Sequence, residues 1–376
     1  MYANKKRMNR EMAVSPIVAT LVLIVVAVIG AVAVGTIMGT FSTQVSKQAS
    51  SSQAASASQN EIIIAGSTTA IPVEQNLAAD FERANPGVQI NVQGGGSSVG
   101  PQSVALGIAD IGATSSSSTI SSAITNNPNS QIYQNLYYTQ IGGRGIVFIQ
   151  DASGIAVPNN VVSASDVAAA YNNVSGDGTE KGVVANFSAS KNVTIEQREA
   201  GSGTMSTAFG WAGLSSTQKS NGVANAVVNN GNAAMLASVQ AGSSSHPAFG
   251  FVDSGYAITG GLSSNTTAPG ILIVGVIGSN GVQYVPTHTN IENALHDWYY
   301  SKAQDTTSGP NYPQGLVGGL YWITTGSAPS TFNGNQITEG TSSASSIVTG
   351  LISFAKSPSE VTAFSNAGVY SMYNFI

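Results

Sequence analysis

The sequence predicts an α/β protein with two lobes and a mainly parallel sheet, preceded by one N-terminal transmembrane helix. The chain of 376 residues is too long for one small hydrophobic core. After residue 60, short apolar stretches alternate with amphipathic helix-like stretches, which is typical of parallel sheets. Residues 13–41 contain no charged side chain and exceed the roughly 20 apolar residues that cross a bilayer.

The first 60 residues divide into a basic leader (1–12), the apolar helix (13–41) and a linker rich in Ser, Gln and Ala (42–60). The cations of the leader are Lys5, Lys6, Arg7 and Arg10. Because positive flanks stay inside, we expect a cytoplasmic N-terminus and a cell-surface, extracytoplasmic main body. The apolar segment is longer than that of a cleaved secretory signal. Sequons that are candidate glycosylation sites on such a protein occur at Asn173, Asn186, Asn192 and Asn265.

The stretch 12–20, Met-Ala-Val-Ser-Pro-Ile-Val-Ala-Thr, resembles the N-terminus of archaeal type IV pilin-like proteins. The resemblance implies removal of the leader near Met12 and a helix that bundles into a filament. Small residues on one helix face favour self-association, and they are Ala27, Ala31, Gly35 and Gly39. Bacterial pilins carry a Glu after the cleavage point, and this chain has none there. A plain membrane anchor and a filament-forming helix therefore both stay open.

Composition excludes several classes of function. Charged residues make up only 8% of the chain, with 13 Lys and Arg against 18 Asp and Glu, so no basic stripe suits nucleic acid. The absence of Cys excludes disulfides and thiolate chemistry. The three histidines lack metal-ligand spacing and are interpreted as surface or packing residues: His246, His288 and His296. No nucleophile has a neighbouring His, and no paired acids occur, so we predict no enzyme, no cofactor and no metal site.

Turns rich in Gly, Ser and Thr follow each of the first three predicted strands and precede a helix. The strands are 61–65, 88–93 and 109–113, and the turns are 66–69, 94–98 and 114–118. A fourth such turn begins at Arg198 and carries hydroxyls at Ser202 and Thr204, before a helix over 205–211. One turn of this kind is ordinary helix capping. Four of them predict a small-anion site, because helix N-termini present unpaired N–H groups with partial positive charge.

These motifs, in this order and spacing, resemble the phosphate-binding solute receptor of phosphate-specific ABC transporters. The matching stretches are Gly66-Ser67-Thr68-Thr69, Gly94-Gly95-Gly96-Ser97, Ala109-Asp110-Ile111-Gly112 and Arg198-Glu199-Ala200-Gly201-Ser202-Gly203-Thr204. Stretches 248–256, 312–313, 320–326 and 368–370 fit the same family. The resemblance runs from about residue 61 to the end. It implies a two-lobe, class II periplasmic-binding-protein fold, with lobe I at 61–143 and 256–376 and lobe II at 144–255.

Carried over residue by residue, the resemblance implies a phosphate site between the lobes. Its residues would be Thr68, Ser97, Ser115, Arg198, Ser202, Gly203 and Thr204, with Ser67 and Thr69 as adjacent candidates. It also implies closure of the lobes around phosphate or a similar tetrahedral oxyanion, and an ABC permease as partner. The alternative function is a structural or adhesive filament subunit of the pilin-like class, whose outer domain has this fold.

Departures from the family leave anion selectivity open. Ser115 is neutral where many phosphate receptors have Asp, and Ser116 stands where relatives with Ser at the preceding position have Arg. Loss of that cation removes charge-assisted hydrogen bonds to the anion that are worth roughly 1.5–3 kcal/mol of binding free energy. Ala200 replaces an acid that holds the site Arg, and Glu199 is the candidate substitute. At the expected lobe crossover, Arg144 is either a replacement cation or a solvated surface residue.

Overall fold

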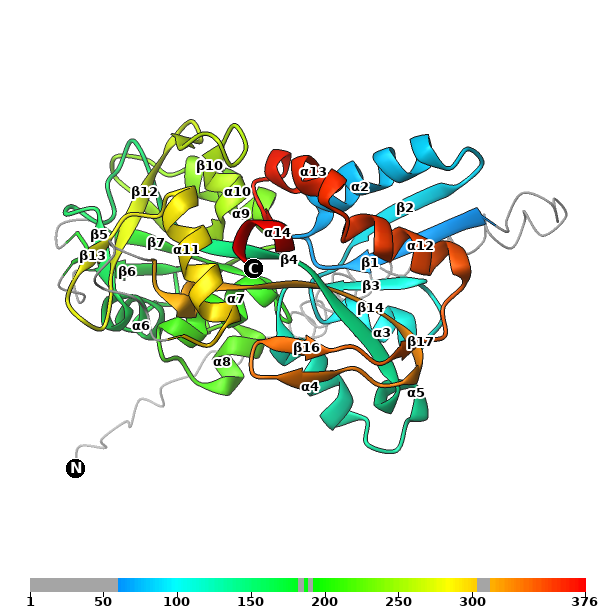
Figure 1. The fold of residues 1–376 in the computed structure, drawn as a ribbon. Helices are drawn as coiled ribbons and strands as arrows, with labels where there is room; N and C mark the ends of the chain where they lie inside the picture. The colour runs from blue at the N-terminus through cyan, green and yellow to red at the C-terminus, as the bar shows by residue number, and fades with distance from the viewer. Residues whose placement is uncertain (1–59, 182–185, 189–191, 303–311) are drawn as a thin grey trace, which may run out of the picture. The chain divides into compact units, whose positions relative to one another are not determined.

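Strand β4 (Leu136–Asp151) is buried along its whole length and belongs to both lobes of the protein (Figure 1). We describe residues 60–181, 186–188, 192–302 and 312–376 of a computed structural model. Residues 136–145 of β4 pair antiparallel with β14 (Val317–Ala328). Residues 146–151 pair antiparallel with β9 (Ala248–Asp253) and β12 (Ile271–Ile277). One continuous strand therefore carries the chain from the first lobe into the second.

The first lobe is built on three parallel strands. Strand β1 (Glu61–Gly66) lies between β2 (Gln89–Gly94) and β3 (Ile111–Thr114), and β3 pairs antiparallel with β14. Helices α2 (Ile71–Ala84), α3 (Val99–Ala105) and α4 (Ser117–Asn126) follow these strands, so the predicted strand–turn–helix units are present. Because the carboxyl ends of parallel strands meet at one edge, the three predicted turns lie together.

Further elements complete this lobe, and in Figure 1 helices α12 and α13 lie beside α2. Trp322 of β14 donates its indole N–H to the buried Glu74 of α2 at 2.8 Å, which ties the sheet to this helix. The remaining elements are α5 (Gln131–Gln134), β15 (Thr331–Asn333), β16 (Gln336–Thr338), β17 (Thr341–Ser342), α12 (Ser346–Ala355), η4 (Pro358–Glu360), α13 (Val361–Asn366) and β18 (Tyr370–Ser371).

The second lobe is organised around β7 (Asn192–Arg198). This strand pairs in parallel with β9 and with β8 (Val227–Asn229), and antiparallel with β6 (Thr179–Lys181). Helix α7 (Gly203–Trp211) follows β7, and α9 (Gly231–Gln240) follows β8. Two more helix N-termini therefore lie at the carboxyl ends of parallel strands.

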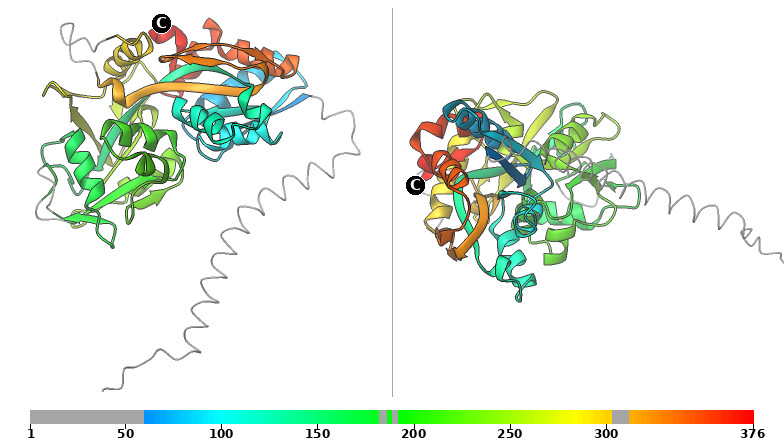
Figure 2. Two further views of the ribbon diagram at one scale, coloured as in Figure 1. Left: turned by 90° about the horizontal axis from the view of Figure 1, so that it is seen from below. Right: turned by 90° about the vertical axis from the view of Figure 1, so that its right-hand side faces the viewer.

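Other elements complete the fold, which Figure 2 shows from two further directions. They are β5 (Val161–Ser163), α6 (Ala164–Asn172), α8 (Ser216–Asn221), α10 (Ser254–Ala257), β10 (Ile258–Thr259), β11 (Thr266–Thr267), β13 (Gln283–Tyr284), α11 (His288–Tyr299), η3 (Gln314–Leu316) and α14 (Met372–Phe375).

Separate hydrophobic cores support the two lobes. One gathers around Trp322 and Phe364, and the other around Phe148, Phe249 and Phe251. Strand β12 packs in the second core because it pairs with β4, although its residues fall in a range that we assigned to lobe I. The sheet is mixed rather than mainly parallel, since β4 and β14 run antiparallel to their neighbours.

The crossing between the lobes is narrow where β4 passes under α11 and α14. A Cβ atom on Gly143 would meet Leu295 Cδ2 at 2.8 Å and Phe375 Cε1 at 2.9 Å. A Cβ atom on Gly145 would meet Ile291 Cγ2 at 2.5 Å. The close packing of α11 and α14 on β4 therefore requires glycine at positions 143 and 145.

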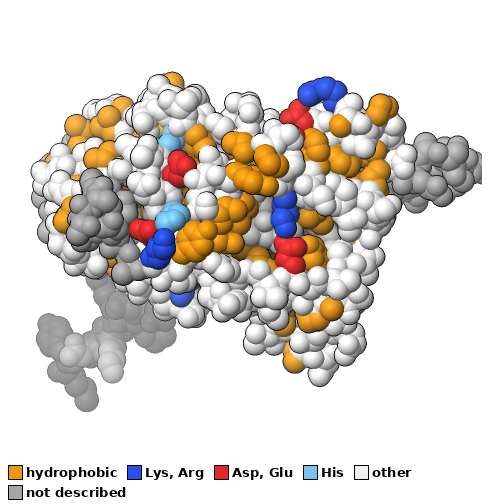
Figure 3. All heavy atoms as spheres, in the orientation of Figure 1, with side chains coloured by type: hydrophobic (Ala, Val, Ile, Leu, Met, Phe, Trp, Pro, Cys, Tyr) orange, Lys and Arg blue, Asp and Glu red, His pale blue; other side chains and the backbone are white. Residues whose placement is uncertain are grey.

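Residues 1–59 lie outside the described ranges, so the leader, the transmembrane or pilin-like helix and its self-association face stay predictions. None of the described helices is both long and apolar enough to span a bilayer. On the face drawn in Figure 3, Lys, Arg, Asp and Glu side chains are few and scattered, as expected from a composition with 8% charged residues.

Candidate functional site

The four predicted turns meet where the two lobes touch. Thr68 and Thr69 lie in the turn after β1, Ser97 in the turn after β2, and Ser115 in the turn after β3. Thr69, Ser97 and Ser115 face the N-terminus of α7 in the second lobe. Residues separated by more than 100 positions in sequence thus form one junction.

Arg198 is the last residue of β7, and it is only 2% exposed. Its Nη2 donates to Thr68 Oγ1 of the first lobe at 2.8 Å, and its Nη1 donates to Asn232 Oδ1 of α9 at 2.7 Å. Glu199 accepts from Nε at 2.9 Å and from Nη2 at 2.8 Å. Glu199 therefore binds the guanidinium through a bidentate pair of hydrogen bonds, which suits the planar Arg side chain. This is the role for which Glu199 was the candidate, because Ala200 stands where relatives have an acid.

Thr69 and Thr204 meet across the junction with Asp253, the last residue of β9. Their Oγ1 atoms are 3.1 Å apart, and both donate to Asp253 Oδ2, at 2.8 Å and 2.7 Å. The Asn232 amide also donates to Asp253 Oδ2 at 2.8 Å. One carboxylate oxygen therefore accepts hydrogen bonds from both lobes.

Ser97, Ser115 and Gly203 form a second cross-lobe contact. The two serine Oγ atoms are 3.0 Å apart, and the Ser115 N–H donates to Ser97 Oγ at 3.1 Å. A Cβ atom on Gly203 would meet Ser115 Oγ at 2.5 Å and Ser97 Oγ at 2.6 Å. Glycine is therefore needed for this close approach between α7 and the two hydroxyls.

The other two predicted residues have supporting positions. Ser202 is the N-cap of α7, where its Oγ accepts from Met205 N at 3.3 Å. Ser67 is buried, and its N–H donates to Ala113 O at 2.9 Å, which fixes the turn after β1 against β3.

Buried backbone N–H groups gather at this junction without an acceptor. Those of Thr69, Ser97, Gly203 and Thr204 form no hydrogen bond within the part of the chain that the structure describes. For Gly203 and Thr204 the reason is that the first N–H groups of a helix have no intrahelical partner. More than nine in ten buried backbone groups in proteins are paired. Such a cluster of free donors is the arrangement that binds anions.

Arg144 lies beneath the junction on β4, and the alternative of a solvated Arg144 is wrong because the residue is fully buried. Its Nε and Nη2 donate to Ser115 O at 3.0 Å and 2.5 Å, and its Nη1 donates to Asp253 Oδ1 at 3.2 Å. Burial lowers the pKa of this guanidinium, and the charge of Asp253 opposes that shift. Since each nitrogen already has an acceptor, Arg144 fastens the turns together.

The charges of the paired side chains at the junction cancel. Arg144 and Arg198 supply two positive charges, and Asp253 and Glu199 supply two negative ones. Uncharged donors must therefore provide much of the attraction for an anion. Within the described ranges, no cluster of three or more His, Cys, Asp or Glu residues has a metal-binding arrangement.

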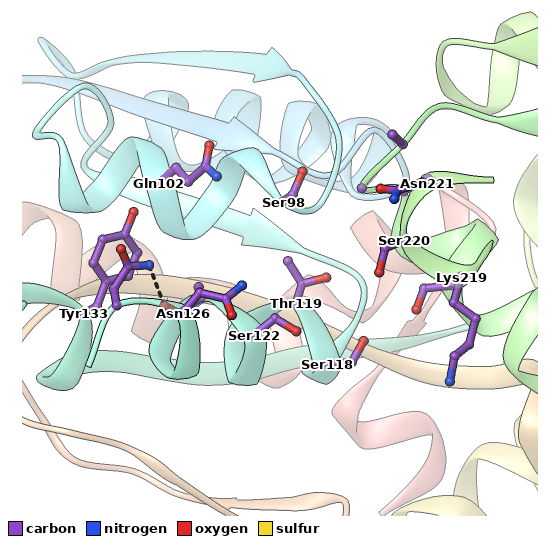
Figure 4. A pocket seen from close by; sticks show the side chains of 16 residues that line it. Ser98, Gln102, Ser118, Thr119, Ser122, Asn126, Tyr133, Lys219, Ser220 and Asn221 are labelled. Carbon is purple, nitrogen blue, oxygen red and sulfur yellow. Dashed lines mark hydrogen bonds between the residues drawn. The ribbon is translucent and has the colours of Figure 1, made fainter. Parts of the chain in front are cut away.

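A cleft of about 440 Å³ borders the junction and separates α3 and α4 from α8 (Figure 4). Its inner end reaches Gly201, whose carbonyl accepts from Ser98 N at 3.3 Å. Hydroxyl and amide side chains dominate its walls: Ser98, Gln102, Ser118, Thr119, Ser122, Asn126, Ser220 and Asn221. Solvent therefore reaches the turn that carries the α7 N-cap.

Residues 51–315 match the model of the PBP superfamily domain, and this match covers more than half of the chain. The chain belongs to the PBP superfamily. Its two-lobe mixed α/β architecture is the periplasmic-binding-protein fold. No curated protein sequence matches it significantly.

Solved structures share the fold of this PBP-superfamily protein at low sequence identity. One, from Clostridium perfringens, is assigned as a phosphate ABC transporter substrate-binding protein and has phosphate bound. It is 18% identical with a TM-score of 0.55, and the alignment covers 83% of this chain and 100% of that one. An ABC-type phosphate transport receptor from Vibrio cholerae is 18% identical with a TM-score of 0.51, over 82% and 99% of the two chains.

Sequence reasoning missed Asn232 and Asp253 and did not foresee how Arg144 is used. Each missed residue adjoins a signal that was available. Asp253 is an acid that directly ends a buried apolar strand, and Asn232 follows a Gly at the start of a helix. Their convergence depends on how β8 and β9 flank β7, which the local sequence does not specify.

Proposed function

We propose that this PBP-superfamily protein is an extracytoplasmic solute-binding protein that captures phosphate, or a similar tetrahedral oxyanion, for uptake by an ABC permease. The observation that carries the proposal is the cluster of buried, unpaired N–H groups from both lobes beside Arg198. The names of the Clostridium perfringens and Vibrio cholerae proteins support phosphate transport as the context.

In the proposed complex, the N–H groups of Ser97, Gly203 and Thr204 donate to the anion, and Arg198 supplies the fixed positive charge. Thr68 accepts from Arg198, so its hydroxyl proton is free to reach the ligand. Ser115 is a further hydroxyl donor, while Ser67, Thr69 and Ser202 hold the turns in place.

Ligand entry requires the lobes to move apart, because Thr68 bonds directly to Arg198 and Thr69 lies 3.1 Å from Thr204. An anion would replace these direct cross-lobe contacts and connect the same groups through its own oxygens. This is the hinge closure that two-lobe binding proteins use.

Calorimetry of the full chain in mild detergent tests the proposal. We expect phosphate to bind and Arg198→Ala to weaken binding about 10- to 150-fold, because each lost charge-assisted hydrogen bond is worth about 1.5–3 kcal/mol. Arg83→Ala is the control, since the Arg83 side chain is 75% exposed and pairs with Asp80 on the surface. Absence of heat with phosphate, sulfate and arsenate would refute the receptor function. Undiminished binding by Arg198→Ala would refute the site.

We also propose that residues 13–41 anchor the protein in the cytoplasmic membrane with residues 1–12 inside. The sequence support is the uncharged apolar segment behind a basic leader. In cell fractionation, the full chain should stay with membranes after a carbonate wash, and a chain that starts at residue 42 should not. Release of the full chain into the wash would contradict the anchor.

A further inference from the structure

The cleft that borders the junction begins directly beside the proposed anion donors (Figure 4). Ser98 follows the donor Ser97 in sequence, and Ser202 precedes the donor Gly203. Ser98 and Ser202 both line the cleft. A chemical group attached to an anion at the junction would therefore extend into this cleft.

One contact between the lobes closes the passage from the junction to the cleft. Ser98 N donates to Gly201 O at 3.3 Å, and a Cβ atom on Gly201 would meet Ser98 Oγ at 2.2 Å. Gly201 also has a φ of 77°, a left-handed conformation that glycine adopts readily. Because Ser98 and Gly201 belong to different lobes, the opening that admits an anion also separates these two residues.

The walls of the cleft can form hydrogen bonds with hydroxyl groups from several directions. Gln102 of α3 and Asn126 of α4 lie on facing walls, and Asn221 lies on the side of α8 (Figure 4). Within the part of the chain that the structure describes, none of these three side-chain amides has a hydrogen-bond partner. A side-chain amide both donates and accepts, as a hydroxyl group does. The lining therefore suits a ligand that carries several hydroxyl groups.

The charge of the cleft favours an anionic ligand over a cationic one. Lys219 is the only charged residue among the described residues that line the cleft, and no Asp or Glu is among them. In the described ranges Lys219 forms no ion pair. Because the paired charges at the junction cancel, Lys219 gives the junction and the cleft together a net positive charge.

The cleft stays open although the lobes touch each other. Thr69 Oγ1 and Thr204 Oγ1 are only 3.1 Å apart across the junction, yet the cleft beside it retains about 440 Å³. Sites for small molecules typically have volumes of about 300–1,000 Å³. A bare phosphate ion at the junction would leave this volume to solvent, whereas a larger organic ligand would fill it.

We propose that the ligand is a phosphate monoester of a polyol or a sugar, with its phosphate at the junction and its hydroxyl groups in the cleft. This inference rests on the proposed function and names the ligand class of the same site. The terminal phosphate oxygens would accept from Arg198 and the backbone N–H groups. The ester oxygen, a weaker acceptor, would face the passage between Ser98 and Gly201. Gln102 and Asn126 would bind hydroxyl groups of the organic part.

Calorimetry of the full chain in mild detergent tests this inference with three esters and inorganic phosphate. Methyl phosphate has the ester bond but no hydroxyl groups, whereas glycerol 3-phosphate and glucose 6-phosphate carry them. We expect at least one of the two polyol esters to bind about tenfold or more tightly than methyl phosphate, because two or three additional hydrogen bonds contribute that much.

A double variant removes one amide from each facing wall of the cleft. Gln102→Ala with Asn126→Ala should weaken binding of the preferred polyol ester about tenfold and leave the affinity for methyl phosphate and inorganic phosphate unchanged. Thr125→Ala is the matched control, since Thr125 is exposed on the same helix and does not line the cleft. It should bind all four compounds as the wild type does.

The outcomes separate this inference from the function on which it rests. Inorganic phosphate that binds while no ester does would overturn the inference alone. Methyl phosphate that binds as tightly as both polyol esters would also overturn it. An equal loss for all four compounds in the double variant would do the same, because a merely structural role predicts that pattern. Failure of inorganic phosphate, sulfate and all three esters to bind the wild type would refute the proposed function instead.

Discussion

Arg198 is held in place by protein groups before any ligand arrives. Glu199 and Asn232 both belong to the same lobe as Arg198, and they accept from its Nε, Nη1 and Nη2 atoms. The guanidinium therefore loses little side-chain freedom on binding, which favours affinity. Glu199 also accepts from Gly231 N at 3.0 Å, so it ties the cation to the start of α9.

Glu74 gives a residue-scale prediction about stability. Burial raises the pKa of its carboxyl to about 8, and the hydrogen bond from Trp322 only partly opposes this. The unfolded chain ionises near 4.5, so the group favours folding most below that pH, and this advantage is lost as pH rises through about 8. Between about pH 5.5 and 7, where the group is ionised in the unfolded chain and protonated in the folded one, it should lower the free energy of unfolding by about 1.4 kcal/mol per pH unit.

Denaturant unfolding of the wild type and of Glu74→Gln at several pH values in this window checks the prediction. Glu74→Gln should remove most of the slope, because the amide does not ionise. Glu61→Gln, at an exposed position of β1, should keep it. Equal slopes for the wild type and Glu74→Gln would show that the carboxyl does not titrate in this way.

Helix α7 brings the N-terminal donors of the second lobe against the hydroxyls of the first, and this contact gives an element-scale prediction. Gly203→Ala places a methyl group 2.5 Å from Ser115 Oγ and 2.6 Å from Ser97 Oγ. We expect the lobes to be held apart and phosphate affinity to fall about tenfold or more in calorimetry, equal to about 1.4 kcal/mol.

Gly210→Ala is a control on the same helix. A Cβ atom at Gly210 would meet only Lys219 Cδ, at 3.7 Å. It should leave phosphate binding unchanged and raise the free energy of unfolding by up to about 1 kcal/mol, because Ala favours a helix over Gly. Weaker phosphate binding in both variants would point to a general effect on α7.

Local elements were predictable where one short stretch determines them. The apolar run 61–65, the glycine-hydroxyl turn and the amphipathic helix after it correspond to β1 and α2. The pairing of β12 with β4 was not predictable, because it joins residues more than 100 positions apart and its uninterrupted apolar sequence fits either lobe. For the same reason, Arg198 was identifiable from its turn, whereas Asp253 acquires its role only through partners in the turn after β1, on β4, on α7 and on α9.

At the scale of the whole molecule, the Arg144–Asp253 pair joins the two lobes beneath the site. Arg144→Met leaves Asp253 buried without its cation, so we expect the free energy of unfolding to fall by about 3–5 kcal/mol. Adding Asp253→Asn removes the uncompensated charge and should recover part of this loss. Chemical denaturation of the wild type, both single variants and the double variant measures the coupling.

Arg83→Met is the comparison for a surface pair, since the Arg83 side chain is 75% exposed beside Asp80. The Arg83→Met substitution should lower the free energy of unfolding by less than about 1 kcal/mol. If Arg144→Met costs as little, or if the double variant shows no coupling, the buried pair does not join the lobes energetically.

The narrow crossing of β4 has a mechanical consequence for ligand exchange. Because Gly143 and Gly145 have no side chains, α11 and α14 pack directly on the backbone that lies on either side of Arg144. A rotation of the lobes about this crossing would displace nearby atoms little and distant atoms more. Arg144 contacts Ser115 and Asp253 at the pivot itself, whereas α4 and α8 line the outer cleft. A rotation that separates Thr68 from Arg198 and Thr69 from Thr204 enough to admit an anion would therefore open the outer cleft between α4 and α8 even further.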